Sequence, residues 1–181
     1  MRAAVAFVVL VALTSIDGQP ACSQEWTPSQ DSVRDATQTV TNYFSMLDSG
    51  NPERAYQMMN DAAKSSIPPT MFAEQSEKFR SQAGPLLERK LLKFTWLKDP
   101  ADAPFPGIYA AVDIATRFEK IDRHCGYIVL YQQPSGGAFH VMRAESNFID
   151  NTTAKKIETT NSKLELDKAW AELSRNCPNF R

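Results

Sequence analysis

The stretch Ile108 to Lys120, IYAAVDIATRFEK, decides the fold, because apolar and polar residues alternate along it. One side of the alternation carries Ile108, Ala110, Val112, Ile114 and Phe118, and the other carries Tyr109, Asp113 and Arg117. A period of two residues is typical of a half-buried β-strand, since successive side chains of a strand point to opposite faces. We therefore expect a strand here, with one face on the core.

Three more segments are expected to be strands. Glu88 to Lys98 (ERKLLKFTWLK) places Leu92, Phe94 and Trp96 on one side. It is separated from Ile108 by the proline-containing linker Asp99 to Gly107, which we expect to be a loop. His124 to Gln133 and Ala138 to Ile149 flank the turn Pro134-Ser135-Gly136-Gly137, so these two segments should form a hairpin.

Helical periodicity dominates the chain before and after these strands. The Thr27-Pro28-Ser29-Gln30 sequence predicts a helix start, Asn51-Pro52 a short second helix, and the segment after Pro68-Pro69 a third that ends by Gly84. Asn151 to Ser162 is polar and is expected to be a loop. Ser162-x-x-Glu165 is a capping box that predicts one last helix, with apolar residues at Leu166, Ala169, Trp170 and Leu173.

The expected order is therefore three helices, four strands and one helix. Helices segregated before an antiparallel sheet indicate an α+β domain, with three N-terminal helices packed on one face of a curved four-stranded sheet. We expect this domain to span residues 24–150 and a C-terminal extension with a helix to span 151–181. A curved sheet covered by helices leaves a concave mouth, where ligands commonly bind.

The N-terminus has the layout of a signal peptide. Arg2 precedes the apolar run Ala3 to Leu13, and small and polar residues follow it. The run has 11 residues, against roughly 20 for a stable membrane span. We expect residues 1–23 to be removed by cleavage after Ser23, which makes the protein periplasmic or secreted. A lipid anchor on Cys22 is the less favoured alternative, because Gln19 stands where lipoprotein signals usually carry an aliphatic residue.

After such a cleavage Cys125 and Cys177 remain. In an oxidising compartment they form either one disulfide or two free thiols. A bridge over this separation would remove roughly 4 kcal/mol of unfolded-chain entropy, and it would join the C-terminal helix to the sheet.

Charge and composition exclude several functions. The chain has 20 Lys and Arg against 21 Asp and Glu, a net charge of −1, so no basic excess points to nucleic acid. His124 and His140 are the two histidines, and no cluster of Cys, His and carboxylate residues predicts a metal site or a cofactor. We expect His124 to be exposed at a strand start, and neither histidine belongs to a recognisable triad.

Three segments carry a family resemblance: Tyr43 to Tyr56 (YFSMLDSGNPERAY), Phe79 to Leu92 (FRSQAGPLLERKLL) and Pro106 to Lys120 (PGIYAAVDIATRFEK). Their order is similar to a family of exported bacterial proteins known as domain of unknown function 4019. That family resembles the cone-shaped, nuclear-transport-factor-2-like superfamily, which includes ketosteroid isomerases and polyketide cyclases. The resemblance covers about Ala36 to Asp150 and implies a cone-shaped fold and export. It implies no chemistry, because the family carries no assigned activity.

Asp113 is the candidate catalytic residue. A carboxylate inside an apolar cone can act as a general base, with Tyr43, Tyr109 or Tyr127 as donor to an oxyanion. The alternative is a solvent-side ladder in which Asp113 pairs with Arg117, as Arg143 and Glu145 do on the last strand.

Ring side chains supply the candidate ligand contacts. Tyr43, Trp96, Tyr109 and Tyr127 could line a cavity in the cone, although aromatic stripes more often serve packing. Three functions follow. The first is a non-enzymatic exported domain that binds a small apolar molecule or an envelope protein. The second is an isomerase or lyase with Asp113 as base, and the third is a structural envelope component. Cone-shaped domains often pair through the outer face of the sheet, so a homodimer is a further expectation.

Overall fold

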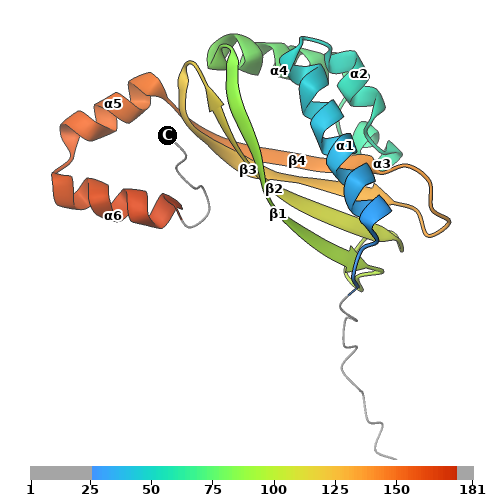
Figure 1. The fold of residues 1–181 in the computed structure, drawn as a ribbon. Coiled ribbons are helices and arrows are strands. Elements are labelled where there is room, and N and C mark those ends of the chain that lie inside the picture. Colours follow the sequence, from blue (N-terminus) through green and yellow to red (C-terminus); the bar gives the residue numbers. More distant parts are fainter. Residues whose placement is uncertain (1–25, 175–181) are drawn as a thin grey trace, which may run out of the picture.

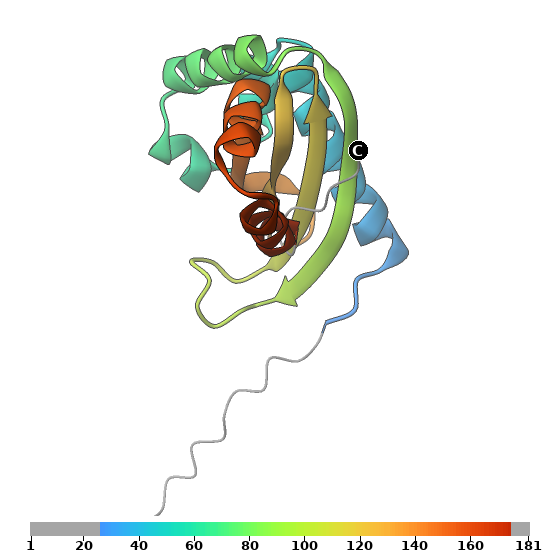
Figure 2. The same ribbon diagram turned by 90° about the vertical axis from the view of Figure 1, so that its left-hand side faces the viewer.

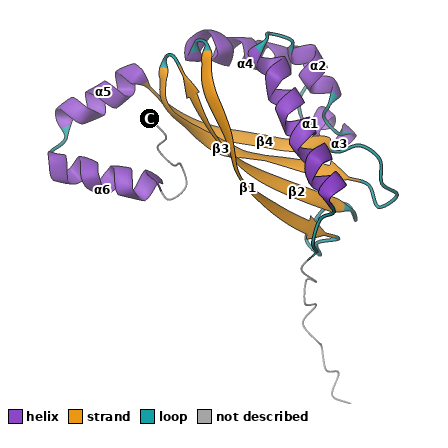
Figure 3. Cartoon of the chain, in the orientation of Figure 1, coloured by secondary structure: helices purple, strands orange, loops and turns teal. Residues whose placement is uncertain are grey.

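The computed structural model describes residues 26–174. Figure 1 shows the arrangement of the elements, and Figure 3 shows the same view coloured by secondary structure. The helices before the sheet are α1 (Gln30–Asp48), α2 (Pro52–Gln57), α3 (Asp61–Ser66) and α4 (Pro69–Ala83). The strands are β1 (Leu86–Lys98), β2 (Ile108–Phe118), β3 (Ile121–Gln132) and β4 (His140–Asp150), and α5 (Asn151–Thr160) and α6 (Lys163–Ser174) follow.

The four strands form one antiparallel sheet in the order β1-β2-β3-β4. Each strand is hydrogen-bonded to the strand next to it in the sequence, so short connections suffice. The alternation in β2 gives the strand one buried face, as predicted: Val112 and Ile114 are buried in the core, whereas Asp113 between them is exposed. The predicted α+β architecture, with helices against a curved antiparallel sheet, is confirmed.

The first helix covers the inner face of this sheet. Ser29 caps α1 by accepting a hydrogen bond from the backbone N–H of Ser32 at 3.0 Å. Its buried residues recur at helical spacing and pack on the inner residues of the central strands, which together form the main core. From α1 this core takes Ala36, Val40, Tyr43 and Phe44, and from the strands it takes Ala110, Val112, Ile114, Ile128, Leu130 and Val141.

The edge strand β1 departs from strict alternation. Its pairing with β2 shifts register between Leu86 and Glu88 and again between Leu91 and Lys93, so Leu87 and Leu92 are extra residues at bulges. Leu91 and Phe94 therefore pack on the core, while Leu92 is 41% exposed. The expectation that Leu92 shares a face with Phe94 and Trp96 was wrong, because a bulge inverts the alternation.

The expected three N-terminal helices are four. The chain leaves α2 at Met58 and forms a short bridge to β4 before α3 begins: Val141 N–H donates to Met58 O, and Asn60 N–H donates to Val141 O, each at 2.9 Å. The Asn60 side chain then caps α3 by accepting from Ala63 N–H at 2.8 Å. The pairing with β4 and the Asn60 cap divide the predicted second helix into α2 and α3. Hydrophobic periodicity predicts neither feature.

The C-terminal part has two helices where one was expected. Asn151 to Thr160, predicted as a loop, is the helix α5. Asp150 caps it by accepting a hydrogen bond from Thr153 N–H at 2.9 Å, and Ala154 is buried on its inner side. A polar surface helix has nearly the same composition as a loop, so composition alone did not predict α5. The features that distinguish it are the Asp150 cap and the buried Ala154.

The helices α5 and α6 lie on the side of the sheet opposite α1, as Figure 2 shows. Within residues 26–174 no helix is long and apolar enough to cross a membrane. The predicted signal peptide and cleavage site, the alternative lipid-anchor residue Cys22, and Cys177 lie outside the described residues.

Candidate ligand-binding cavity

A cavity of about 320 Å³ opens between α1, α4 and the inner face of the sheet. Its wall carries several aromatic rings, because aromatic residues of α1, α4 and β2 face one another there. The rings that line it are Tyr43, Phe44, Phe72, Phe79 and Phe118. This volume is at the lower end of the roughly 300–1,000 Å³ found for small-molecule sites. The arrangement provides space for a small molecule.

A largely buried ion pair joins the helix side of the cavity to the sheet side. Arg89 of β1 binds Asp48 at the end of α1 through both terminal nitrogens, with Nη2 donating to Oδ1 at 3.1 Å. Its Nε donates to Thr116 Oγ1 at 3.2 Å, and its guanidinium carbon lies 4.4 Å from the ring centre of Phe44. This bidentate ion pair holds the end of α1 against β1.

His124 forms part of the cavity wall and is only 6% exposed. The ring centres of Phe79 and Phe118 lie 5.4 and 5.3 Å from that of its imidazole. Burial lowers the pKa of His124 to about 4, and the positive charge of Arg89 acts in the same direction. The imidazole is therefore neutral at pH 7. Within residues 26–174 its Nδ1 atom has no hydrogen-bond partner.

Tyr43 contributes the second neutral polar group. It is 3% exposed and lines the cavity from α1. Burial raises the pKa of its hydroxyl to about 12, so the group keeps its proton. Among the described residues the hydroxyl has no hydrogen-bond partner. Buried polar groups are normally satisfied, so the unused imidazole nitrogen of His124, together with this hydroxyl, suggests a binding site.

Charged residues at the cavity wall have partners of opposite sign. Arg80 donates to Glu77 through Nε and Nη2 at 2.9 and 2.8 Å. Glu145 accepts from Arg143 Nε at 2.6 Å and from the hydroxyl of Tyr127 at 2.7 Å. With Asp48 bound to Arg89, the described charged groups around the cavity compensate one another.

Of the four predicted ring contacts, the structure places Tyr43 in the cavity. Tyr127 borders the cavity, but it pairs with Asp113 in the strand register, so its ring lies on the outer face of the sheet. The hydroxyl of Tyr127 is already bound to Glu145, so Tyr43 is the better placed of the two. Trp96 instead packs against Trp26, Phe94 and Phe139, at ring distances of 5.9 to 6.0 Å. Tyr109 donates to the backbone oxygen of Phe105 at 2.7 Å and lies outside the cavity wall.

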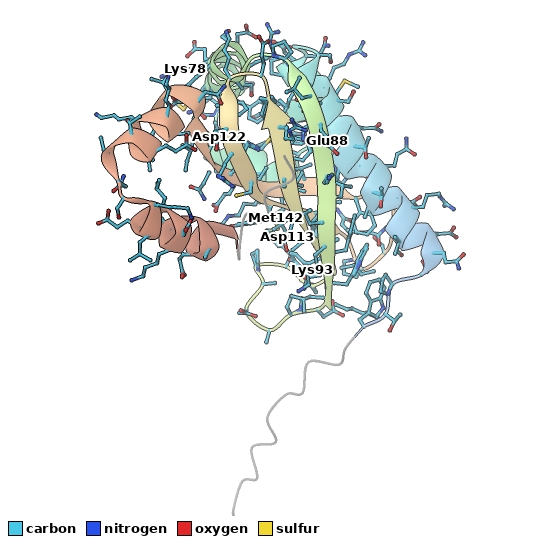
Figure 4. The ribbon with its side chains drawn as sticks, turned by 60° about the vertical axis from the view of Figure 1, so that its left-hand side comes forward. Lys78, Glu88, Lys93, Asp113, Asp122 and Met142 are labelled. Carbon is cyan, nitrogen blue, oxygen red and sulfur yellow. The ribbon has the colours of Figure 1, made fainter. Side chains whose placement is uncertain are left out.

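Asp113 lies on the other face of the sheet. It is exposed, is not part of the cavity wall, and stands opposite Lys93 and Tyr127 in the strand register. Figure 4 looks onto this face, and both Asp113 and Lys93 are labelled there. This placement puts Asp113 on the solvent side, as the charge-ladder alternative expected, but among the described residues Arg117 pairs with Glu88 at 3.7 Å and not with Asp113. It gives no support to a general base inside the cone.

Three residues of the site were not found from the sequence. Asp48 and Arg89 were not singled out, because their pairing depends on a contact between segments 41 residues apart. His124 was expected to be exposed, and that was wrong: Phe79 from α4 covers it, and the sequence does not show this contact. Cys125 is buried in β3 at 9% exposure, on the face turned to α5 and α6.

The fold is an α+β domain in which helices cover one face of a curved four-stranded antiparallel sheet and leave a cavity between them. The chain belongs to the family described as "Protein of unknown function (DUF4019)", whose profile matches residues 39–142, more than half of the chain. No curated protein matches it. Among solved structures it is similar to Aln2 from a Streptomyces species, with a TM-score of 0.48 and 9% identity, over 67% of this chain and 93% of that one.

Proposed function

We propose that this protein is a non-enzymatic domain that binds a small, mainly apolar molecule in the cavity between α1, α4 and the sheet. The observation that carries the proposal is the cavity itself, whose wall combines several aromatic rings with the buried, unpartnered Nδ1 of His124 and with a Tyr43 hydroxyl that makes no hydrogen bond within the described residues. A few polar groups in a mainly apolar pocket are typical of ligand sites. A core built for packing alone would satisfy or omit such groups.

The described wall of the cavity holds no unpaired carboxylate that could serve as the base in the isomerase or lyase alternative. That reaction requires a base beside the substrate, and the candidate base Asp113 is exposed on the opposite face. The carboxylates at the cavity, Asp48 and Glu145, are both bound to arginines, which occupies their oxygens.

Export is the second part of the proposal. It is supported by the sequence of residues 1–23, with cleavage after Ser23 and delivery to the periplasm or the medium. A disulfide between Cys125 and Cys177 belongs to the same proposal, since it requires an oxidising compartment. Edman sequencing of the protein recovered from the periplasm should give Gln24 as the first residue.

Native mass spectrometry of protein purified from the periplasm tests the binding function. We expect a retained small molecule that denaturation releases. An Ala144→Phe variant places a ring at the cavity wall and should lose this molecule, whereas Asp113→Asn on the opposite face should keep it. A folded wild-type protein that carries no ligand and binds none from a small-molecule library would contradict the proposal.

A further inference from the structure

We infer that the cavity selects uncharged, ring-shaped molecules of one or two rings that carry a hydrogen-bonding atom, and that His124 makes the hydrogen bond to that atom. This inference rests on the proposed function and adds to it the class of ligand and the residue that recognises it.

The preference for an uncharged ligand follows from the charges at the wall. Each charged side chain that lines the cavity is bound to an opposite charge, Asp48 to Arg89, Arg80 to Glu77 and Glu145 to Arg143. An ion that entered would lose its hydration and meet no unmatched counter-charge among the described residues. A neutral molecule avoids this cost.

The preference for rings follows from the shape and chemistry of the wall. Phe72, Phe79 and Phe118 present ring surfaces to the cavity, and such surfaces favour stacked or edge-on contacts with another ring. The volume of about 320 Å³ limits the ligand to a small ring system.

The role of His124 follows from its unused nitrogen. The side chain is 94% buried, given its exposure of 6%, and Nδ1 has no partner within the described residues. A site with an unpaired buried polar group favours ligands that satisfy the group over analogues of equal shape that do not. The rings of Phe79 and Phe118 hold the imidazole in one orientation. A ligand must therefore present its hydrogen-bonding atom in a matching position.

Three related compounds test the inference: indole, its carbon analogue indene, which has nearly the same shape but no N–H group, and indole-2-carboxylate. Calorimetry on the purified mature protein should show indole binding about fivefold more tightly than indene, the effect of one hydrogen bond. Indole-2-carboxylate should bind at least about tenfold more weakly than indole. In His124→Phe, indole and indene should bind equally.

A second measurement avoids reliance on the variant. The chain has two histidines, so the imidazole nitrogen signals of His124 can be followed by NMR, with the exposed His140 as an internal reference. Indole should shift the His124 signals and leave those of His140 unchanged. Equal binding of indole and indene to the wild type, or tighter binding of the carboxylate, would overturn the inference and leave the proposed function intact. Failure of all three to bind would count against both.

Discussion

Arg89 on the edge strand holds Asp48 at the end of the first long helix with both terminal nitrogens of its guanidinium group. The side chains are 13% and 22% exposed, so the pair is largely buried. The same guanidinium covers Phe44 and donates to Thr116, and it thereby connects α1, β1 and β2 at one wall of the cavity. The other ion pairs of α1 in the part of the chain that the structure describes stay within the helix, so this contact alone ties its charged residues to the sheet.

Arg89→Met should therefore be strongly destabilising. It leaves the carboxylate of Asp48 largely buried without its partner, which typically costs about 3–5 kcal/mol. Urea unfolding followed by circular dichroism measures the change. The double variant Arg89→Met with Asp48→Leu should recover most of the loss. As a control, Arg34→Met removes an exposed pair with Asp31 on α1 and should change stability by less than about 1 kcal/mol.

The free energy of unfolding should fall as the pH is lowered from about 6.5 toward 4, because His124 is buried in its neutral form. The folded-state pKa is about 4, below the usual value of 6.5, so the folded state favours the neutral imidazole. This contribution is complete above about pH 6.5 and is lost as the pH falls toward 4, for a total of about 3 kcal/mol. Carboxylates titrate in the same range, so the comparison is with His124→Phe, whose unfolding free energy should fall less steeply. Parallel pH profiles for the two proteins would contradict the burial of a neutral His124.

Tyr43→Phe should separate stability from binding. The change removes a hydroxyl that has no hydrogen-bond partner among the described residues and keeps the buried ring. Loss of an unsatisfied group is neutral or stabilising, so we expect the free energy of unfolding to rise by about 0–1 kcal/mol. The retained ligand should bind more weakly. A loss of more than about 1 kcal/mol in stability would mean that the hydroxyl has a structural partner.

Gly126 is required by the close approach of β4. A Cβ atom built at this position would lie 1.9 Å from the backbone oxygen of Glu145, so the two strands would have to separate. Gly126→Ala should therefore destabilise the protein by at least about 1–3 kcal/mol, the usual cost of an overpacked site. Ser146→Ala, at the position opposite in the register, should change stability by less than about 0.5 kcal/mol. Thermal unfolding of the two variants compares them directly.

The proposed disulfide between Cys125 and Cys177 is tested by mass spectrometry of the non-reduced mature protein. We expect no cysteine to react with iodoacetamide under denaturing conditions until a reductant is added. On the loop-closure view, Cys177→Ser should lower stability by roughly 4 kcal/mol. Two alkylated thiols in the untreated protein would exclude the bridge.

Particular residues show how far the sequence leads. Val112 and Ile114 alternate with Asp113, and this local pattern was enough to predict β2 and its buried face. His124 lies in a strand that was also predicted, but its environment depends on Phe79 in a distant helix, and the prediction of exposure failed. The prediction that Leu92 shares a face with Phe94 failed for a related reason: a bulge depends on the pairing between two strands and not on one strand alone.

The sequence by itself determined the class of fold, the positions of the four strands along the chain and the apolar face of the first helix, because hydrophobic periodicity is a local property of the chain. Only the tertiary structure decided where the cavity lies and which groups line it. Asp48, Arg89 and His124 come from α1, β1 and β3, and their burial, their charges and their unused hydrogen-bonding atoms arise only when those elements pack together.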